Sequence, residues 1–140
     1  MIEFRKTFGG DAAMPVEDLV IDSTYAASAK KNDLVKSSGG VITALTATDA
    51  NVLGMYEGPT LQHPTETTKK GKIRTNPLAL YEVSYVGGTP NVGLSYGVSV
   101  ASDGTYQMNV ADTTHTILKV HELLENGNAM VGLNKASTIL

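Results

Sequence analysis

Residues 34–46 read LVKSSGGVITALT and contain the clearest β-hairpin pattern in the chain. A short run, Leu34-Val35-Lys36, and a run rich in β-branched residues, 41–46, stand on either side of Ser37-Ser38-Gly39-Gly40. Val, Ile and Thr are enriched in strands, and a short glycine-containing loop between two such runs is typical of a β-hairpin. The stretch therefore predicts two antiparallel neighbours.

The same rhythm of short strands and turns continues in both directions. Further strands are predicted at 19–21, 52–57, 72–75, 78–86, 95–100, 104–110, 115–124 and 129–133. Asp103-Gly104 and Asn126-Gly127 mark two more hairpins. Gly54, inside a strand, predicts a bulge or a close backbone crossing. Residues 26–31 are the only helix-like run, and 58–70 form the longest loop.

Strands at this spacing predict a mostly β protein, a single compact β-sandwich or β-barrel-like domain of short antiparallel strands. We expect this β-rich domain to span residues 18–140, preceded by an extended N-terminal arm at 1–17. The arm carries Ile2 and both Phe residues of the chain, Phe4 and Phe8. It either packs as a strand on its own domain or docks on a neighbour, and both alternatives stay open.

The composition excludes several classes of function. The chain has 140 residues, a net charge of -3 and no Cys, which excludes disulfides, Cys-ligated metals and a thiol nucleophile. With 14 acidic against 11 basic residues, we expect no nucleic-acid partner. We also expect no membrane partner, because no run approaches the roughly 18 apolar residues of a membrane span. The first residues lack the apolar region of a secretory signal, which favours synthesis in the cytoplasm.

The residues that could support catalysis do not form a convincing site. His63 with Glu66 lies in a polar loop, and His115 and His121 would stand far apart on one strand. Residues 93–97 match G-x-S-x-G, but a strand is predicted after them where a nucleophile elbow needs a helix. We therefore expect a protein that is not an enzyme, with no catalytic residues, no cofactor and no metal ligands.

Two surface features leave alternatives open. The basic cluster of Lys69, Lys70, Lys72 and Arg74 is either a solvated strand edge or a docking point for an acidic partner. Tyr81 and Tyr85 share a predicted strand face. They either pack across strands or form a stacking platform, as in a small carbohydrate- or ligand-binding β module.

An ordered series of short motifs runs through most of the chain. In order, these are Asn32-Asp33-Leu34-Val35-Lys36, Gly39-Gly40-Val41-Ile42, Ala47-Thr48-Asp49-Ala50, Val52-Leu53-Gly54, Gly71-Lys72-Ile73-Arg74, Tyr81-Glu82-Val83, Tyr85-Val86-Gly87, Gly93-Leu94-Ser95-Tyr96-Gly97-Val98, Asp103-Gly104, Val110-Ala111-Asp112-Thr113-Thr114 and Leu118-Lys119-Val120. The series, from about residue 19 to 133, resembles the capsid decoration proteins of tailed bacteriophages, also called head cement or head-stabilising proteins.

The resemblance implies a non-enzymatic virion structural protein that binds the outer surface of a phage capsid and stabilises the shell. It implies the major capsid protein lattice as partner, self-association (often as trimers), and a location on the capsid exterior after synthesis in the host cytoplasm. An N-terminal segment often pairs with the shell by strand addition in this family, which would make Ile2, Phe4 and Phe8 the capsid-binding residues. The extra length at residues 58–70 departs from the smaller trimeric type, so stoichiometry and capsid position stay open.

Overall fold

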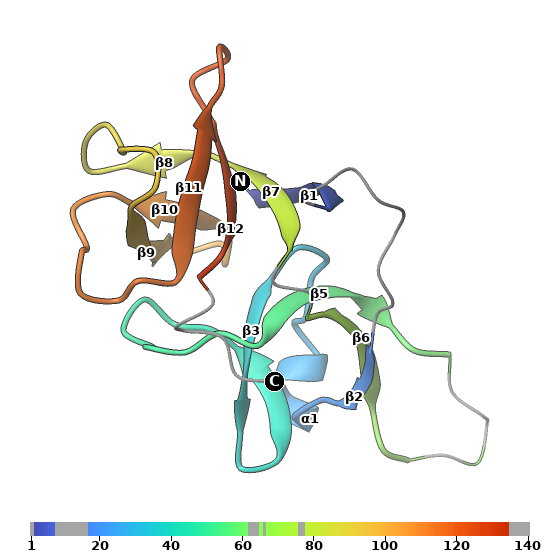
Figure 1. The fold of residues 1–140 in the computed structure, drawn as a ribbon. Coiled ribbons are helices and arrows are strands. Elements are labelled where there is room, and N and C mark those ends of the chain that lie inside the picture. The colour runs from blue at the N-terminus through green and yellow to red at the C-terminus, as the bar shows by residue number, and fades with distance from the viewer. Residues whose placement is uncertain (1, 8–16, 62–64, 66, 76–77, 135–140) are drawn as a thin grey trace.

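The computed structural model describes residues 2–7, 17–61, 65, 67–75 and 78–134, which form short strands and one short helix (Figure 1). The described elements are β1 (Ile2–Thr7), β2 (Glu17–Val20), α1 (Ser23–Ala26), β3 (Leu34–Ser38), β4 (Val41–Ala44), β5 (Gly54–Pro59), β6 (Lys70–Arg74), β7 (Ala79–Val83), β8 (Tyr85–Val86), β9 (Ser95–Val100), β10 (Tyr106–Asn109), β11 (Leu118–Leu123) and β12 (Ala129–Leu133).

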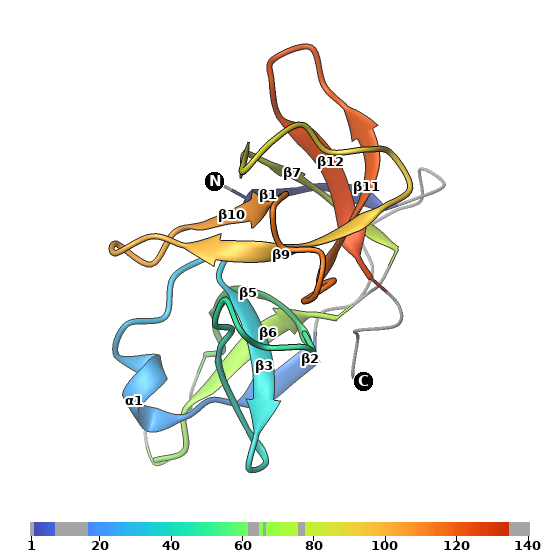
Figure 2. The same ribbon diagram turned by 90° about the vertical axis from the view of Figure 1, so that its left-hand side faces the viewer.

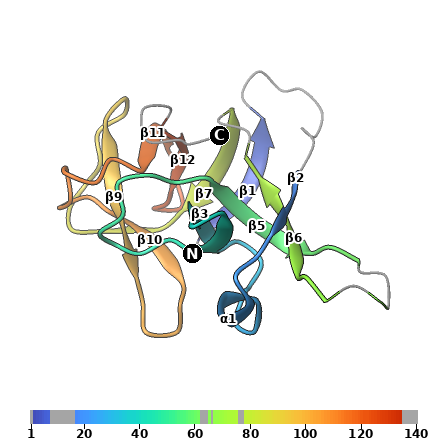
Figure 3. The same ribbon diagram turned by 90° about the horizontal axis from the view of Figure 1, so that it is seen from below.

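The strands form two sheets that face each other. A five-stranded sheet has the order β2-β6-β5-β3-β4, and a seven-stranded sheet has the order β1-β7-β12-β11-β9-β10-β8. Figure 2 shows the seven-stranded sheet above the five-stranded one, and Figure 3 shows β2 and β6 on one side of the molecule with β9, β11 and β12 on the other. The predicted fold class, a compact mostly β domain of sandwich or barrel-like form, is confirmed.

The five-stranded sheet curls into a half-barrel. Its two outer strands approach each other where Ile21, just after β2, forms a parallel bridge with Ile42 on β4. The backbone N–H of Asp22 donates to the carbonyl of Ile42 at 2.9 Å. The carboxylate of Asp22 then caps α1 by accepting the N–H groups of Thr24 and Tyr25 at 3.1 and 3.0 Å.

The hairpin predicted from residues 34–46 is present as β3 and β4. Ser38 pairs with Val41 across a two-residue turn at Gly39 and Gly40, whose φ angles are 61° and 85°. Positive φ at both central residues belongs to the tight turns whose twist matches that of paired strands, and glycine adopts it without a steric penalty. The hairpins at Asp103-Gly104 and Asn126-Gly127 are also confirmed.

The first residues of β3 and β5 are buried on both faces of the five-stranded sheet. Leu34 and Met55 belong to the hydrophobic core between the two sheets, whereas Val35 and Tyr56, one residue further on, belong to the core inside the half-barrel. All four side chains are at most 5% exposed. Because successive side chains of a strand point to opposite faces, these two strands connect both cores.

Gly54 at the start of β5 allows a close backbone crossing, as predicted from the sequence. A Cβ atom at this position would lie 2.2 Å from the carbonyl oxygen of Arg74 on β6. That distance is far below any van der Waals contact, so the backbone of one strand would have to move.

Several sequence-based predictions are wrong in detail. The strand predicted over 78–86 is interrupted at Ser84, and its two parts, β7 and β8, are not neighbours in the seven-stranded sheet. The helical turn lies at Ser23–Ala26 and not at 26–31, because the carboxylate of Asp22 starts it earlier. The strand predicted over 115–124 begins at Leu118, so His115 lies outside it. A bulge between Val120 and Glu122 then interrupts its pairing with β12, at His121.

We predict that Gly54→Ala lowers the free energy of unfolding by about 3 kcal/mol or more, because the added methyl group meets backbone and not a movable side chain. Gly39→Ala is the control: nothing lies within 4 Å of its Cβ position, and its positive φ costs only about 1 kcal/mol. Urea denaturation of both variants measures the difference. Equal losses would show that the crossing at Gly54 carries no special constraint.

Candidate docking site

The outer edge of β1 is the candidate docking site. β1 pairs antiparallel with β7, from Ile2 opposite Val83 to Thr7 opposite Ala79. It stands at the end of the seven-stranded order, so its other edge has no strand partner among the described residues. An edge of this kind presents backbone N–H and C=O groups to any further strand that approaches.

Of the three residues predicted to bind the capsid, Ile2 is the one whose side chain the structure describes. Ile2 is 4% exposed and packs in the core between the sheets, so it holds β1 on its own domain. Residues 2–7 thus follow the own-domain alternative for the N-terminal arm, as a strand of the seven-stranded sheet. The side chain of Phe4 and the whole of Phe8 lie outside the described residues.

A polar network fixes β1 to the sheet. Glu82 on β7 is 8% exposed, and its carboxylate accepts hydrogen bonds from the side chains of Asn126 at 3.0 Å and Asn128 at 2.7 Å. Arg5 on β1 donates to the same carboxylate at 3.1 Å, with a second contact at 2.9 Å. The carboxylate of Glu82 therefore joins β1, β7 and the turn between β11 and β12.

This network has a defined charge state. The hydrogen bonds from Asn128 and Asn126, and then the nearby charge of Arg5, lower the pKa of Glu82. The carboxylate stays ionised near neutral pH, as the ion pair with Arg5 requires. Sequence reasoning placed Glu82 on one face of a strand but gave no sign of its partners, which come from positions 77 residues before it and 44 and 46 residues after it.

The edge itself carries features that restrict pairing. The register between β1 and β7 shifts between Phe4 and Lys6, which marks a bulge. Arg5 also forms a 2.9 Å ion pair with Glu3, and both side chains are 45% exposed. Bulges and charges on an edge strand discourage indiscriminate association with other strands.

The other residues considered from the sequence do not come together with this edge. His115 contacts the carboxylate of Asp112 at 2.9 Å, and the same carboxylate accepts the N–H groups of Thr114 and His115, which is the hydrogen bonding of a polar turn. Ser95, in the G-x-S-x-G match, starts β9, and a strand follows it. His63 and Glu66 lie outside the described residues.

The structure shows the positions of the tyrosine pair and of the basic cluster that the sequence singled out. Tyr81 is fully buried and Tyr85 packs against the core between the sheets, so this pair forms no exposed stacking platform. Lys70 and Lys72 are exposed on β6. Arg74 instead is 8% exposed and pairs with Glu57 at 2.6 Å, so it does not extend the basic surface.

Two further observations bear on partners. Among the described residues, no three His, Asp or Glu side chains gather in a way that could hold a metal ion. The described part of the chain also has no helix with the length and apolar character of a membrane span.

Neither a protein-family model, nor a curated protein, nor a solved structure matches the chain.

We predict that Ile2→Ala lowers the free energy of unfolding by about 2–4 kcal/mol, because it leaves a cavity in the core. Val20→Ala is the matched control on a strand residue that is 36% exposed, and it should change stability by no more than about 0.5 kcal/mol. Thermal and urea unfolding test both variants. An Ile2→Ala protein as stable as the parent would show that β1 is not held through this side chain.

We also predict that Glu82 contributes to acid unfolding. Because its folded pKa is lowered, its stabilisation is present above the unfolded pKa near 4.5 and is lost as the pH falls through the folded value. Glu82→Gln should therefore be less stable than the parent near neutral pH and show a flatter loss of stability below about pH 4.5. Glu122→Gln, at an exposed position on β11, is the control. An unchanged slope for Glu82→Gln would contradict the network.

Proposed function

We propose that this protein is a non-enzymatic virion structural protein that binds the outer surface of a phage capsid and stabilises the shell. The observation that carries the proposal is the outer edge of β1, held in place by Ile2 and Glu82 and without a strand partner among the described residues. A segment of the major capsid protein adds to this edge as a further strand of the seven-stranded sheet.

Strand addition suits this task physically. Main-chain hydrogen bonds supply the attraction, and the side chains next to the edge select the register. Glu3, Arg5 and the bulge between Phe4 and Lys6 are the selecting features here. The β1 edge is built on a rigid base, because Arg5 is tied to Glu82 and Ile2 is in the core, so little ordering is needed on binding.

The resemblance of the ordered motifs between residues 19 and 133 to capsid decoration proteins supports the same proposal. A capsid offers many identical sites, so several linked copies of the protein gain avidity from individually modest contacts. This favours self-association, with a trimer as the form that the resemblance implies. The alternative of a sugar-stacking module loses its basis in Tyr81, which is fully buried.

A pair of proline variants tests the β1 edge. N–H groups of successive strand residues point to opposite sides, so one of Glu3→Pro and Phe4→Pro breaks the pairing with β7 and the other removes an N–H from the open edge. The variant that melts like the parent is the edge variant. Glu3→Ala and Phe4→Ala, which keep the N–H groups, are the controls.

Each protein is mixed with assembled shells of a phage major capsid protein, and binding is measured by co-sedimentation. We expect the edge variant to bind at least about tenfold more weakly than its alanine control, because it loses a backbone hydrogen bond and part of the register. A folded edge variant that binds shells as tightly as the parent would move the docking site elsewhere. Absence of binding by the parent itself would contradict the proposed function.

A further inference from the structure

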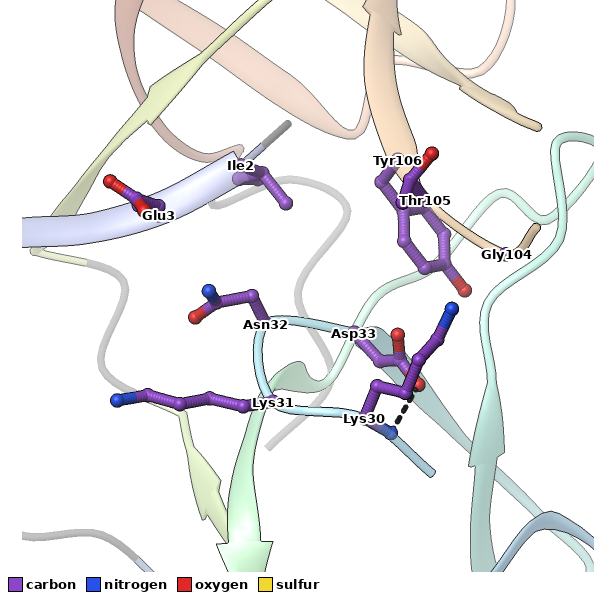
Figure 4. A pocket seen from close by; sticks show the side chains of 9 residues that line it. All are labelled: Ile2, Glu3, Lys30, Lys31, Asn32, Asp33, Gly104, Thr105 and Tyr106. Atoms are coloured by element: carbon purple, nitrogen blue, oxygen red, sulfur yellow. Dashed lines mark hydrogen bonds between the residues drawn. The ribbon is translucent and has the colours of Figure 1, made fainter. Parts of the chain in front are cut away.

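A groove separates the half-barrel from the β9–β10 hairpin. Its larger part encloses about 590 Å³ and lies between residues 44–47 on one side and 100–106 on the other. A smaller part of about 230 Å³ extends toward Ile2 and Glu3 (Figure 4). Both parts share Lys30, Asp33, Gly104 and Tyr106, and the larger part alone has the size of a ligand pocket.

Asp33 is a buried carboxylate at the junction of the two parts. It is 7% exposed, and its Oδ2 atom accepts the hydroxyl of Tyr25 at 2.8 Å and the backbone N–H of Lys30 at 3.0 Å. Its Oδ1 atom accepts no hydrogen bond from the described residues, and Asp33 has no ion-pair partner among them. Figure 4 shows the carboxylate pointing toward the space between Lys30 and Tyr106.

The tyrosine hydroxyl groups around Asp33 keep their protons, because their pKa values are raised. Burial raises the pKa of Tyr25, and both its hydrogen bond to Asp33 and the negative charge of Asp33 raise that pKa further. Burial and the same charge raise the pKa of Tyr56 and of Tyr106. The Tyr106 hydroxyl is already engaged, donating to the carbonyls of Leu45 at 2.6 Å and Leu34 at 3.2 Å. A buried carboxylate with a remaining acceptor atom is best satisfied by a cationic donor.

The chain places one of its own cations in the same groove. The side chain of Lys30 reaches across it, and its ammonium group donates to the carbonyl oxygen of Asp103 in the β9–β10 turn. Gly104 makes room for this ammonium, because a Cβ there would lie 2.9 Å from the Lys30 nitrogen. The groove therefore already accommodates a primary ammonium on an aliphatic stem.

The walls suit such a stem. The larger part is lined by the apolar side chains of Ala44, Leu45, Ala47 and Val100 and by the polar side chains of Thr46 and Ser102. Long basic side chains pack their methylene groups on apolar surface and extend the charged head to a polar partner. We propose that this groove binds a Lys or Arg side chain presented by an extended segment of a partner protein, with the charged head on the Oδ1 atom of Asp33. This inference does not rest on the edge of β1 or on a capsid.

The test titrates isotope-labelled protein with short capped peptides that carry a central Lys, Arg or norleucine, and follows the backbone amide signals by NMR. Norleucine keeps the aliphatic stem and lacks the charge. We expect saturable shifts at Thr46 and Gly104 with the Lys or Arg peptide below about 10 mM, and at least tenfold weaker binding of the norleucine peptide. Equal binding of the norleucine peptide, or no saturable shift with any peptide, would overturn the proposal.

Asp33→Asn is the decisive variant, since it keeps an acceptor for Tyr25 and Lys30 but removes the charge. We expect it to weaken binding of the charged peptide at least about tenfold, whereas Asp18→Asn, at an exposed position on β2, leaves binding unchanged. Lys30→Ala removes the competing ammonium and should bind at least as tightly as the parent. Parent-like binding by Asp33→Asn, or weaker binding by Lys30→Ala, would contradict the assigned contact.

One further variant keeps the test valid if Asp33→Asn does not fold. Ala47→Trp, at an exposed position on the groove wall, adds a bulky side chain to the groove and should abolish the shifts. Persisting shifts would place the peptide elsewhere. A parallel titration with glucose and maltose addresses the other ligand class: saturable sugar binding at the same amides, without peptide binding, would overturn the assignment to a basic side chain.

Discussion

The structure depends on the double burial of β3 and β5. Leu34 and Met55 face the seven-stranded sheet, while Val35 and Tyr56 face the interior of the half-barrel. A substitution at one of these four residues therefore disturbs one core and also acts on the strand that supports the other core. The hydroxyl of Tyr106 adds a polar tie between the two sheets, since it donates to the carbonyls of Leu34 and Leu45. The two sheets thus behave as one packed unit, and everything at their shared boundary is held to a narrow geometry.

Both candidate interaction sites follow from this arrangement. The β1 edge is positioned by Ile2 in the core between the sheets and by the Glu82 carboxylate on the outer side of β7. The groove exists because the β9–β10 hairpin and the half-barrel separate beyond Tyr106, and Asp33 lies immediately before β3 at that point. The proposed role in stabilising a shell would favour such rigid surfaces, because contacts on a preordered surface lose less conformational entropy on binding.

Local patterns predicted most of the elements. The hairpin at 34–46 could be predicted because two short strand-forming runs flank a pair of glycines, and both glycines adopt the positive φ that the turn requires. The close backbone crossing at Gly54 could also be predicted, because a glycine inside a strand often marks a bulge or a place where another backbone approaches closely. The predicted boundaries of helices and strands were wrong where a capping side chain or a bulge overrode the local sequence pattern. Asp22 starts α1 before the helix-like run, and a bulge after Val120 interrupts an otherwise regular alternation.

The class of fold and the position of the main turns follow from the sequence, because strand preference and turn chemistry depend on neighbouring residues. The pairing of residues 2–7, the partners of Glu82 and the surroundings of Asp33 do not follow from it. They depend on the tertiary structure, since Arg5, Glu82 and Asn128 are far apart in the chain. The same holds for the groove, whose walls come from residues 25–47 and 100–106. Long-range contacts of this kind arise from how two sheets pack, and no local pattern records them.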